Sequence, residues 1–406
     1  MLPPKDALAR ILAHIPGPGA IEEVPLAAAA GRSLARPTVS DVDLPPFEKS
    51  MMDGYALRAG DVPAGAGAGA ETPLHLAGES RAGVPFAGPV PPGSCVEIYT
   101  GAALPPGCDA VVMQEDARRE GGDVLVRGPV EPGQHVSHRA EILARGRAVH
   151  APRRRLSAAD IAVLAAIGCE RVPCFVRPRV SVLTTGDELV PVRATPGPGQ
   201  IREGNTYFLA AACAALGCEV IRAGIVPDEP RALEEAFRAA LAAGDVLVTT
   251  GGVSVGKYDL VGAALEKIGV ACLLHKVAVK PGKPIWFGMA GARPVFGLPG
   301  NPVSTLLGLE VFVRPALARL AGAGVEEERE RLGRGRWCGP PTRSGDRQHN
   351  VPARRQEGED GVALLLPVPW RGSADIVAVA EADALAVIEA GAEIRPGEIV
   401  CYRPLR

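Results

Sequence analysis

Acidic side chains and glycines follow several β-prone runs in the second half of the 406-residue chain. Asp187 and Glu188 follow one run, Asp228 follows the next, and Gly251 and Gly252 follow a third. In an open α/β sheet, ligands bind beyond the carboxyl ends of the parallel strands, so these residues would meet at one edge. Carboxylates suit a hard cation, and a glycine loop beside a helix N-terminus suits a phosphate. The pattern predicts a site for a phosphate-bearing ligand and a divalent metal.

The segment Thr249–Asp259, TTGGVSVGKYD, carries most of this prediction. Its glycines leave backbone N–H groups open, as in an anion-binding nest, and Asp259 follows closely enough to hold a bridging cation. It is neither a Walker A loop nor GxGxxG. Farther along, Lys276 and Lys280 would share one side of the chain if the residues between them are extended, because strand side chains alternate. Two ammonium groups on one face suit a small oxyanion.

Each of these features also has a purely structural interpretation. An acid after a strand often caps the next helix, and paired glycines often form only a tight turn. Lysines are also common on edge strands that face solvent. For any single feature the structural interpretation is the stronger one. A fourth strand end is the strand–turn–helix junction Gly297–Ser304. Four such features at corresponding strand ends in one domain favour a functional site.

Composition excludes several classes of protein. Lys+Arg 44 against Asp+Glu 46 gives a formal net charge of −2, which argues against a nucleic-acid partner. Charged residues, prolines and glycines interrupt every apolar run before the ~20 residues that cross a bilayer, and the first residues do not resemble an export signal. The nine cysteines show no paired spacing, which is typical of reduced thiols. We therefore expect a cytoplasmic protein without a membrane segment.

The elements that would position the site alternate between strand and helix patterns. This alternation predicts a doubly wound α/β domain over residues 178–324. Before it, residues 48–136 hold short β-prone runs between Pro/Gly turns, with Ala64–Ala70 as a flexible surface loop. A small β domain is predicted after the charged run Val325–Arg334. Within the α/β domain, the expected strands are 180–184, 219–226, 245–250 and 295–298, and the expected helices are 205–216, 231–243, 260–268 and one starting at Pro302.

Six motifs occur in one order along the chain. They are SMMDGYA (50–56), YTGAALPPGCDAVV (99–112), TTGDEL (184–189), TTGGVSVGKYD (249–259), KVAVKPGKP (276–284) and GLPGNPVS (297–304). Together they resemble the molybdopterin molybdenumtransferase family, MoeA, which is related to the gephyrin E domain. The resemblance covers nearly the whole chain and is weakest in the C-terminal domain.

The resemblance implies an α/β and β multidomain protein that forms an elongated homodimer. Its parts would be a discontinuous N-terminal domain (1–44 and 139–177), a β domain (45–138), a three-layer MogA-like α/β domain (178–324) that binds molybdopterin, and a C-terminal β-barrel domain (325–406). Further partners implied are a molybdopterin adenylyltransferase and molybdoenzyme apoproteins.

The resemblance also implies a reaction, the insertion of molybdate into adenylylated molybdopterin with Mg²⁺, giving molybdenum cofactor and AMP. The implied catalytic residues are Asp53, Thr100, Asp259, Lys276 and Lys280. The implied metal ligands are Glu188, Asp228 and Asp259. The implied substrate-binding residues are Gly251, Gly252, Ser254, Gly297, Pro299, Gly300, Asn301 and Ser304, together with Arg347 and Ser373 on the molybdate side.

One segment departs from the family pattern. Where the family reads RRxGED, this chain has HRAEI, so that Ala140 replaces the glycine and Ile142 replaces an acid. Any role of that acid is therefore either missing in this chain or performed by another residue. His135, His138 and Glu141 share helical spacing, but the Pro/Gly flanks favour a surface cluster over a metal triad. Three alternatives stay open: a scaffold that binds molybdopterin without catalysis, a tungstate-preferring enzyme, and an adenylyltransferase relative.

Overall fold

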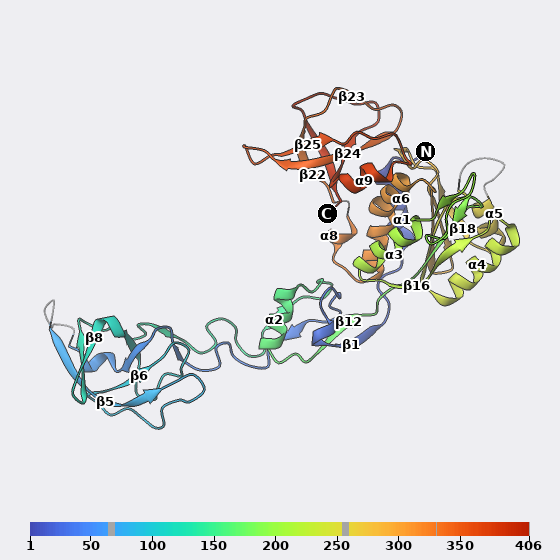
Figure 1. Ribbon diagram of the computed structural model, residues 1–406. Coiled ribbons are helices and arrows are strands. Elements are labelled where there is room, and N and C mark those ends of the chain that lie inside the picture. The colour runs from blue at the N-terminus through green and yellow to red at the C-terminus, as the bar shows by residue number, and fades with distance from the viewer. Residues whose placement is uncertain (64–69, 254–259, 330, 406) are drawn as a thin grey trace. The chain divides into compact units, whose positions relative to one another are not determined.

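A computed structural model describes residues 1–63, 70–253, 260–329 and 331–405. The chain forms two compact units, whose helices and strands are drawn in Figure 1. Unit 1 comprises residues 1–36, 152–161 and 171–406, and unit 2 comprises residues 37–151 and 162–170. In the described parts of the chain, no helix has the length and apolar character needed to cross a membrane.

The α/β part of unit 1 is built on a six-stranded sheet in the order β16-β13-β17-β21-β20-β18. The first four of these strands are parallel neighbours, whereas β20 and β18 add an antiparallel edge. The sheet is therefore mixed, and sequence patterns alone did not predict its two antiparallel strands, β20 and β18. The strands are β13 (Arg179–Thr185), β16 (Glu219–Val226), β17 (Val246–Thr250), β18 (Ala271–His275), β20 (Trp286–Ala290) and β21 (Arg293–Leu298).

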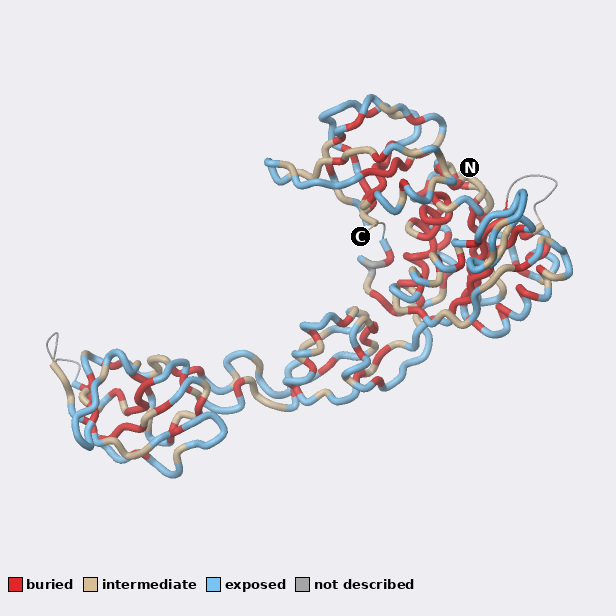
Figure 2. Tube along the Cα trace, viewed as in Figure 1, coloured by how far each residue is buried: buried red, intermediate tan, exposed pale blue. Residues whose placement is uncertain are grey.

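Helices cover both faces of this sheet, and the strands supply one core to each face. In β17, Val246 and Val248 pack into the core on one face, and Leu247 packs into the core on the other. This alternation follows from the two-residue period of a strand. Buried residues accordingly follow the sheet strands in Figure 2. One face is covered by α1 (Pro4–His14), α3 (Asn205–Ala215), α6 (Pro302–Gly308), the π-helical turn η4 (Leu309–Val313) and α7 (Arg314–Leu320), and the other by α4 (Pro230–Ala243) and α5 (Leu260–Lys267).

Helix α1 belongs to the α/β core. Its residues Ala7, Leu8 and Ile11 are buried with Leu317 and Leu320 of α7. The rest of the N-terminal segment in unit 1 forms β1 (Ile21–Pro25), which pairs antiparallel with β12 (Arg171–Phe175), and a single turn, η1 (Leu26–Ala28). Helix α2 (Ala158–Ala166) lies in the sequence between these strands. The predicted four-domain boundaries stay a prediction.

The C-terminal part of unit 1 is a closed five-stranded barrel. Its strands follow the order β24-β25-β22-β28-β26, and β26 pairs back with β24. Strand β19 (Val279–Lys280), which follows the α/β edge strand β18 in sequence, pairs with β24 outside the ring. The other bounds are α8 (Val325–Glu328), β22 (Gly333–Trp337), β23 (Thr342–Arg343), β24 (Gln348–Glu357), β25 (Ala363–Pro367), α9 (Ile376–Glu381), β26 (Ala384–Ile388), β27 (Glu393–Ile394) and β28 (Ile399–Pro404).

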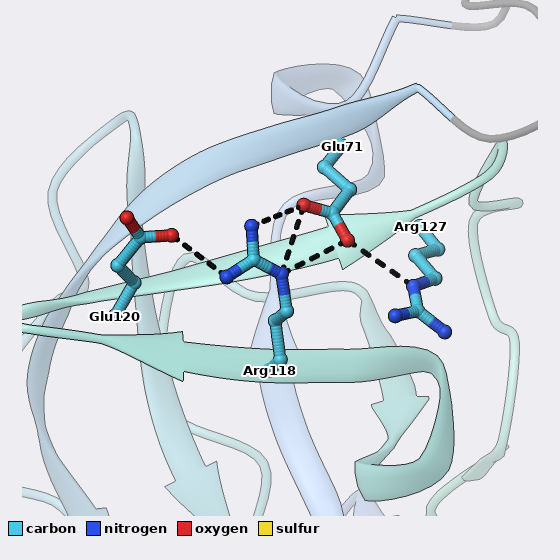
Figure 3. Close-up of polar contacts among 4 residues, drawn as sticks. All are labelled: Glu71, Arg118, Glu120 and Arg127. Carbon is cyan, nitrogen blue, oxygen red and sulfur yellow. Dashed lines mark hydrogen bonds and ion pairs between the residues drawn. The ribbon is translucent and has the colours of Figure 1, made fainter.

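Unit 2 holds a six-stranded sheet in the order β7-β4-β6-β5-β9-β8. On its exposed side, Arg118 donates to Glu71 and Glu120, and Arg127 donates to the same Glu71 (Figure 3). These solvent-exposed pairs join three strands but add only modestly to stability. The predicted loop at residues 64–69 lies outside the described residues. The strands are β4 (Gly54–Leu57), β5 (Glu71–Ser80), β6 (Ser94–Ile98), β7 (Ala110–Met113), β8 (Ala117–Glu120) and β9 (Asp123–Arg127), with short pairs β2 (Thr38–Val39) and β11 (Ala148–His150), and β3 (Lys49–Ser50) and β10 (Val136–Ser137), and single turns η2 (Ala59–Asp61) and η3 (Gln114–Asp116).

Candidate functional site

A cleft of about 730 Å³ lies at the carboxyl ends of the parallel strands β13, β17 and β21. This is the edge at which an α/β sheet normally binds its ligand. Seven of the residues named from the sequence line the cleft: Glu188, Asp228, Gly251, Gly252, Pro299, Gly300 and Asn301. Its other lining residues include Thr184, Thr185, Arg202, Glu203, Asn205 and Phe208, none of which was a predicted site residue.

Asp228 brings an unsatisfied carboxylate oxygen to this cleft. Its Oδ1 atom is buried without a hydrogen-bond partner, and so is Oγ1 of Thr185. The two side chains are close enough for Thr185 to lower the pKa of Asp228, although they do not meet hydrogen-bond geometry. Burial, followed by repulsion from Asp187 and Glu188, nevertheless raises the pKa of Asp228 above its ordinary value. The half-buried carboxylate of Asp228 therefore has one buried oxygen without a partner to compensate its charge.

The glycine loop follows β17 and turns sharply under the cleft. Gly251 has φ +95° and Gly252 has φ +62°, which is the left-handed region that favours glycine. The N–H of Gly251 donates to the carbonyl of Leu298 at 3.1 Å, so this amide is not available to a ligand anion. Of the predicted nest, only the amides of Gly252 and Val253 stay open within the described residues. Ser254 and Asp259 lie outside the described residues.

The described residues contain no group of three or more His, Cys, Asp or Glu side chains arranged to hold a metal ion. Because Asp259 lies outside them, the predicted ligand set of Glu188, Asp228 and Asp259 cannot be placed as a whole. Two observations fit a cation at this position. The Oδ1 atom of Asp228 lacks a partner, and the carboxylate of Glu188 lines the same cleft.

A turn after β21 joins the cleft to the C-terminal part of unit 1. Asn301 donates from Nδ2 to Oγ of Ser373 at 2.8 Å, and the N–H of Val303 donates to the carbonyl of Ser373 at 3.0 Å. Ser373 therefore lies beside the N-terminus of α6, although 72 residues separate it from Asn301. Gly297 and Ser304 are buried on either side of this turn and do not line the cleft.

Lys276 and Lys280 do not lie on one continuous strand. The alternation of strand side chains therefore does not place them on the same face, as the sequence analysis required. Strand β18 ends at His275, and Lys276 turns the chain with φ +70°. Lys280 then pairs in register with His349 of the barrel. Arg347 donates to the carbonyl of Val279 at 3.4 Å, which brings it next to Lys280 rather than to the lining of the cleft.

A short connection that was not among the predicted site residues also lines the cleft. Strands β14 (Leu189–Val190) and β15 (Ile201–Arg202) pair in parallel and return the chain to the cleft. Glu203 is buried and its Oε1 accepts from the N–H of Thr206 at 2.6 Å, which satisfies one free amide of α3. Asn205 donates to the carbonyl of Gly300 at 2.7 Å. The only signal in the sequence was a polar Arg-Glu-Gly-Asn junction before a helix.

Asp53 and Thr100 lie together in unit 2. Asp53 Oδ1 accepts from the N–H and from Oγ1 of Thr100, each at 2.7 Å. These two bonds lower the pKa of Asp53 below its ordinary value, and the bond from the backbone N–H of Thr100 has the larger effect. Asp53 is therefore an exposed anion held in one orientation by its neighbour, as a ligand-orienting residue needs to be.

The segment that departs from the family pattern is tied down by local bonds. Glu141 accepts from Oγ of Ser137 at 2.8 Å and from the N–H of His138 at 3.0 Å, and His138 contacts Glu48. Ala140 occupies the left-handed region at φ +60°, a conformation that favours glycine. Ile142, in the position of the family acid, is 74% exposed.

Comparison with known proteins finds three family models that match successive parts of the chain. Residues 2–168 match the MoeA N-terminal region (domains I and II), residues 181–319 match a probable molybdopterin-binding domain, and residues 340–405 match the MoeA C-terminal region (domain IV).

Full-length relatives agree with these matches. A molybdopterin molybdenumtransferase of Haemophilus influenzae is 38% identical over 323 residues, which is 79% of this chain and 78% of the relative. Molybdopterin molybdenumtransferase 1 of Mycobacterium tuberculosis is 34% identical over 98% of this chain and 97% of its own length. The crystal structure of a molybdopterin biosynthesis MoeA protein from Pyrococcus horikoshii OT3 covers the whole chain with a TM-score of 0.84 at 30% identity. The chain therefore belongs to the MoeA family of molybdopterin molybdenumtransferases.

Proposed function

We propose that this chain inserts molybdate into adenylylated molybdopterin and releases AMP, in a reaction that requires Mg²⁺. The observation that carries the proposal is the unsatisfied pair of Asp228 Oδ1 and Thr185 Oγ1 at the strand-end cleft of a molybdopterin-binding domain. Both atoms are oxygens. Oxygen atoms are the ligands that Mg²⁺ prefers, and they also form hydrogen bonds with ordered water. Glu188, Asp228 and Asp259 would hold the metal, which supplies charge stabilisation to a departing phosphate.

The protein's own residues divide the remaining work. Gly252 and Val253 offer backbone donors at the cleft, and the turn Pro299–Asn301 also lines it. Lys276, Lys280 and Arg347 bring positive charge that neutralises molybdate and the charge developing in the transition state. Oriented donors and cations of this kind contribute to catalysis because they need no rearrangement when charge develops.

AMP release measures this function directly. Purified protein with adenylylated molybdopterin, molybdate and Mg²⁺ is expected to release AMP, and Lys276→Ala or Lys280→Ala to slow release by roughly tenfold to a hundredfold. The control, Lys5→Ala, removes an exposed lysine from α1 and is expected to leave the rate unchanged. Chelation of the metal is expected to stop release.

The same assay separates the alternatives. Binding of the adenylate without AMP release identifies a scaffold. Faster release with tungstate than with molybdate identifies a tungstate-preferring enzyme. Turnover of ATP with molybdopterin that has not been adenylylated identifies an adenylyltransferase. Each of these three results contradicts the proposal as stated.

We further propose a homodimer in which Asp53 and Thr100 of one protomer complete the cleft of its partner. Support comes from the large apolar side chains that stay exposed around these residues in unit 2: Met51 is 53% exposed, and Phe47 and Tyr99 are 45% and 39% exposed. Exposed apolar groups that gather in this way mark interaction sites. A molybdopterin adenylyltransferase and molybdoenzyme apoproteins are the further partners that we propose, as donor and acceptor of the cofactor.

Mixed dimers test the shared site. Asp53→Ala and Asp228→Asn chains are each expected to be inactive alone, whereas co-refolded mixtures regain AMP release, because one of the two sites in a mixed dimer is intact. Sedimentation equilibrium establishes the stoichiometry. A monomer, or a dimer whose mixtures regain no activity, contradicts the shared site without touching the proposed reaction.

A further inference from the structure

A second cavity lies in unit 1, lined by five arginines. Its volume is about 20 Å³, and its lining shares no residue with the strand-end cleft. The arginines come from segments far apart in sequence, including the connection before β2, the end of β12 and helix α7. They are Arg32, Arg155, Arg177, Arg314 and Arg331, and the other lining residues are mostly small or apolar.

Three of the guanidinium groups are held in place by backbone carbonyls. Arg32 donates to the carbonyl of Phe175 at 2.7 Å, Arg155 donates to that of Ala215 at 2.9 Å, and Arg314 donates to that of Arg329 at 2.9 Å. Arg32 and Arg314 are buried, with only 8% and 4% of their surface exposed. A carbonyl acceptor orients a guanidinium but does not neutralise its charge.

Two of these arginines form ion pairs with carboxylates. Arg32 pairs with Glu22, and Arg314 pairs with Glu310 at 3.4 Å. Burial raises the pKa of Glu310 even though Arg314 and Arg331 act against the rise. Among the described residues, Arg177 and Arg331 form no ion pair or hydrogen bond. Positive charge converging on one small cavity is unfavourable without a counter-ion.

We propose that this cavity is a binding site for one inorganic tetrahedral oxyanion, of the phosphate or sulfate class. Guanidinium groups present paired N–H donors that match such an anion, and they keep their charge at every physiological pH. The volume has room for a single small group but not for a nucleoside. The site is separate from the proposed chemistry, and it ties together the N-terminal segment, β12 and α7.

Direct binding to the full chain tests the site. Radiolabelled phosphate and sulfate are dialysed against the protein at an ionic strength kept constant with NaCl, and one saturable site per chain is expected. The double variant Arg177→Ala/Arg331→Ala removes the two arginines without protein partners and is expected to weaken binding at least tenfold. Both side chains are exposed, so the fold is not at risk, and circular dichroism checks this.

The matched control removes the same charge elsewhere. Arg222→Ala/Arg238→Ala deletes two exposed arginines of β16 and α4, and phosphate binding is expected to stay within twofold of the unaltered chain. An equal loss in the control shows nonspecific attraction and overturns the proposal, and so does the absence of a saturable site. AMP is the third probe. Binding of AMP through the same two arginines, with none of inorganic phosphate, would overturn the assignment to a free oxyanion.

Discussion

Asp228→Asn should lower the rate of AMP release about a hundredfold while it raises the thermal stability of the protein. The carboxylate oxygen Oδ1 is buried without a partner, and Asp187 and Glu188 repel it. The charged form of Asp228 therefore destabilises the folded state, as is common for groups whose partner is a ligand. Asparagine keeps the size of the side chain and removes its charge. The variant should therefore be more stable, because no cation is needed to neutralise that charge.

The pH dependence of the stability gain follows from the raised pKa. Because the folded state holds the Asp228 proton more tightly than the unfolded state, stability falls as pH rises from the ordinary value of 3.8 through the folded pKa. The amide of the Asp228→Asn variant does not titrate, so the variant has no such loss. Its melting temperature should therefore exceed that of the unaltered chain at pH 7, and the two should converge below about pH 3.8.

Two measurements complete this test. Glu235→Gln removes a carboxylate from the exposed side of α4 and should change neither AMP release nor the melting temperature noticeably. If Asp228→Asn is fully active, Asp228 is not a metal ligand. If the variant is inactive and also less stable at pH 7, the Asp228 carboxylate stabilises the fold through a partner, which contradicts an unsatisfied Oδ1.

The strands and helices of the α/β domain could be predicted from the sequence because their signals are local. Strand β16 has the predicted bounds, 219–226, and helix α3 begins at the predicted residue, Asn205. Both lie between clear turn signals, and their apolar residues repeat with the period of one element. The strand-end position of Asp228 and Gly251 follows from this alternation, and the cleft confirms that these residues lie together.

The parts that could not be predicted depend on pairing between distant segments. The run from Lys276 to Lys280 looks like one strand, yet its two ends belong to an α/β edge and to the barrel, and Lys276 takes a left-handed conformation between them. Neither the contact of Asn301 with Ser373 nor the return of Glu203 to the cleft has a periodic signal. All three features (the Lys276–Lys280 run, the Asn301–Ser373 contact and the position of Glu203) depend on tertiary contacts. Such contacts cannot be predicted from the local patterns of a single sequence.

Gly251→Ala should destabilise the protein by about 3 kcal/mol and abolish AMP release. A Cβ at this position would lie 2.2 Å from the carbonyl oxygen of Thr185, which is backbone and cannot move aside, and φ is +95°. The overlap and the left-handed conformation both oppose alanine. Because Thr185 ends the neighbouring strand β13, relief of the overlap separates the two strand ends that form the cleft.

Two further alanines show whether the effect belongs to this position. Gly224 lies on β16 of the same sheet with nothing within 4 Å of its Cβ position, so Gly224→Ala should leave stability unchanged or slightly higher. At Gly300 a Cβ would meet Gly251 Cα at 3.5 Å, an ordinary contact, and would project at the cleft. Gly300→Ala should therefore keep the free energy of unfolding in urea and weaken only substrate binding. If Gly251→Ala is as stable as Gly224→Ala, the tight approach of β13 and β17 does not shape the cleft.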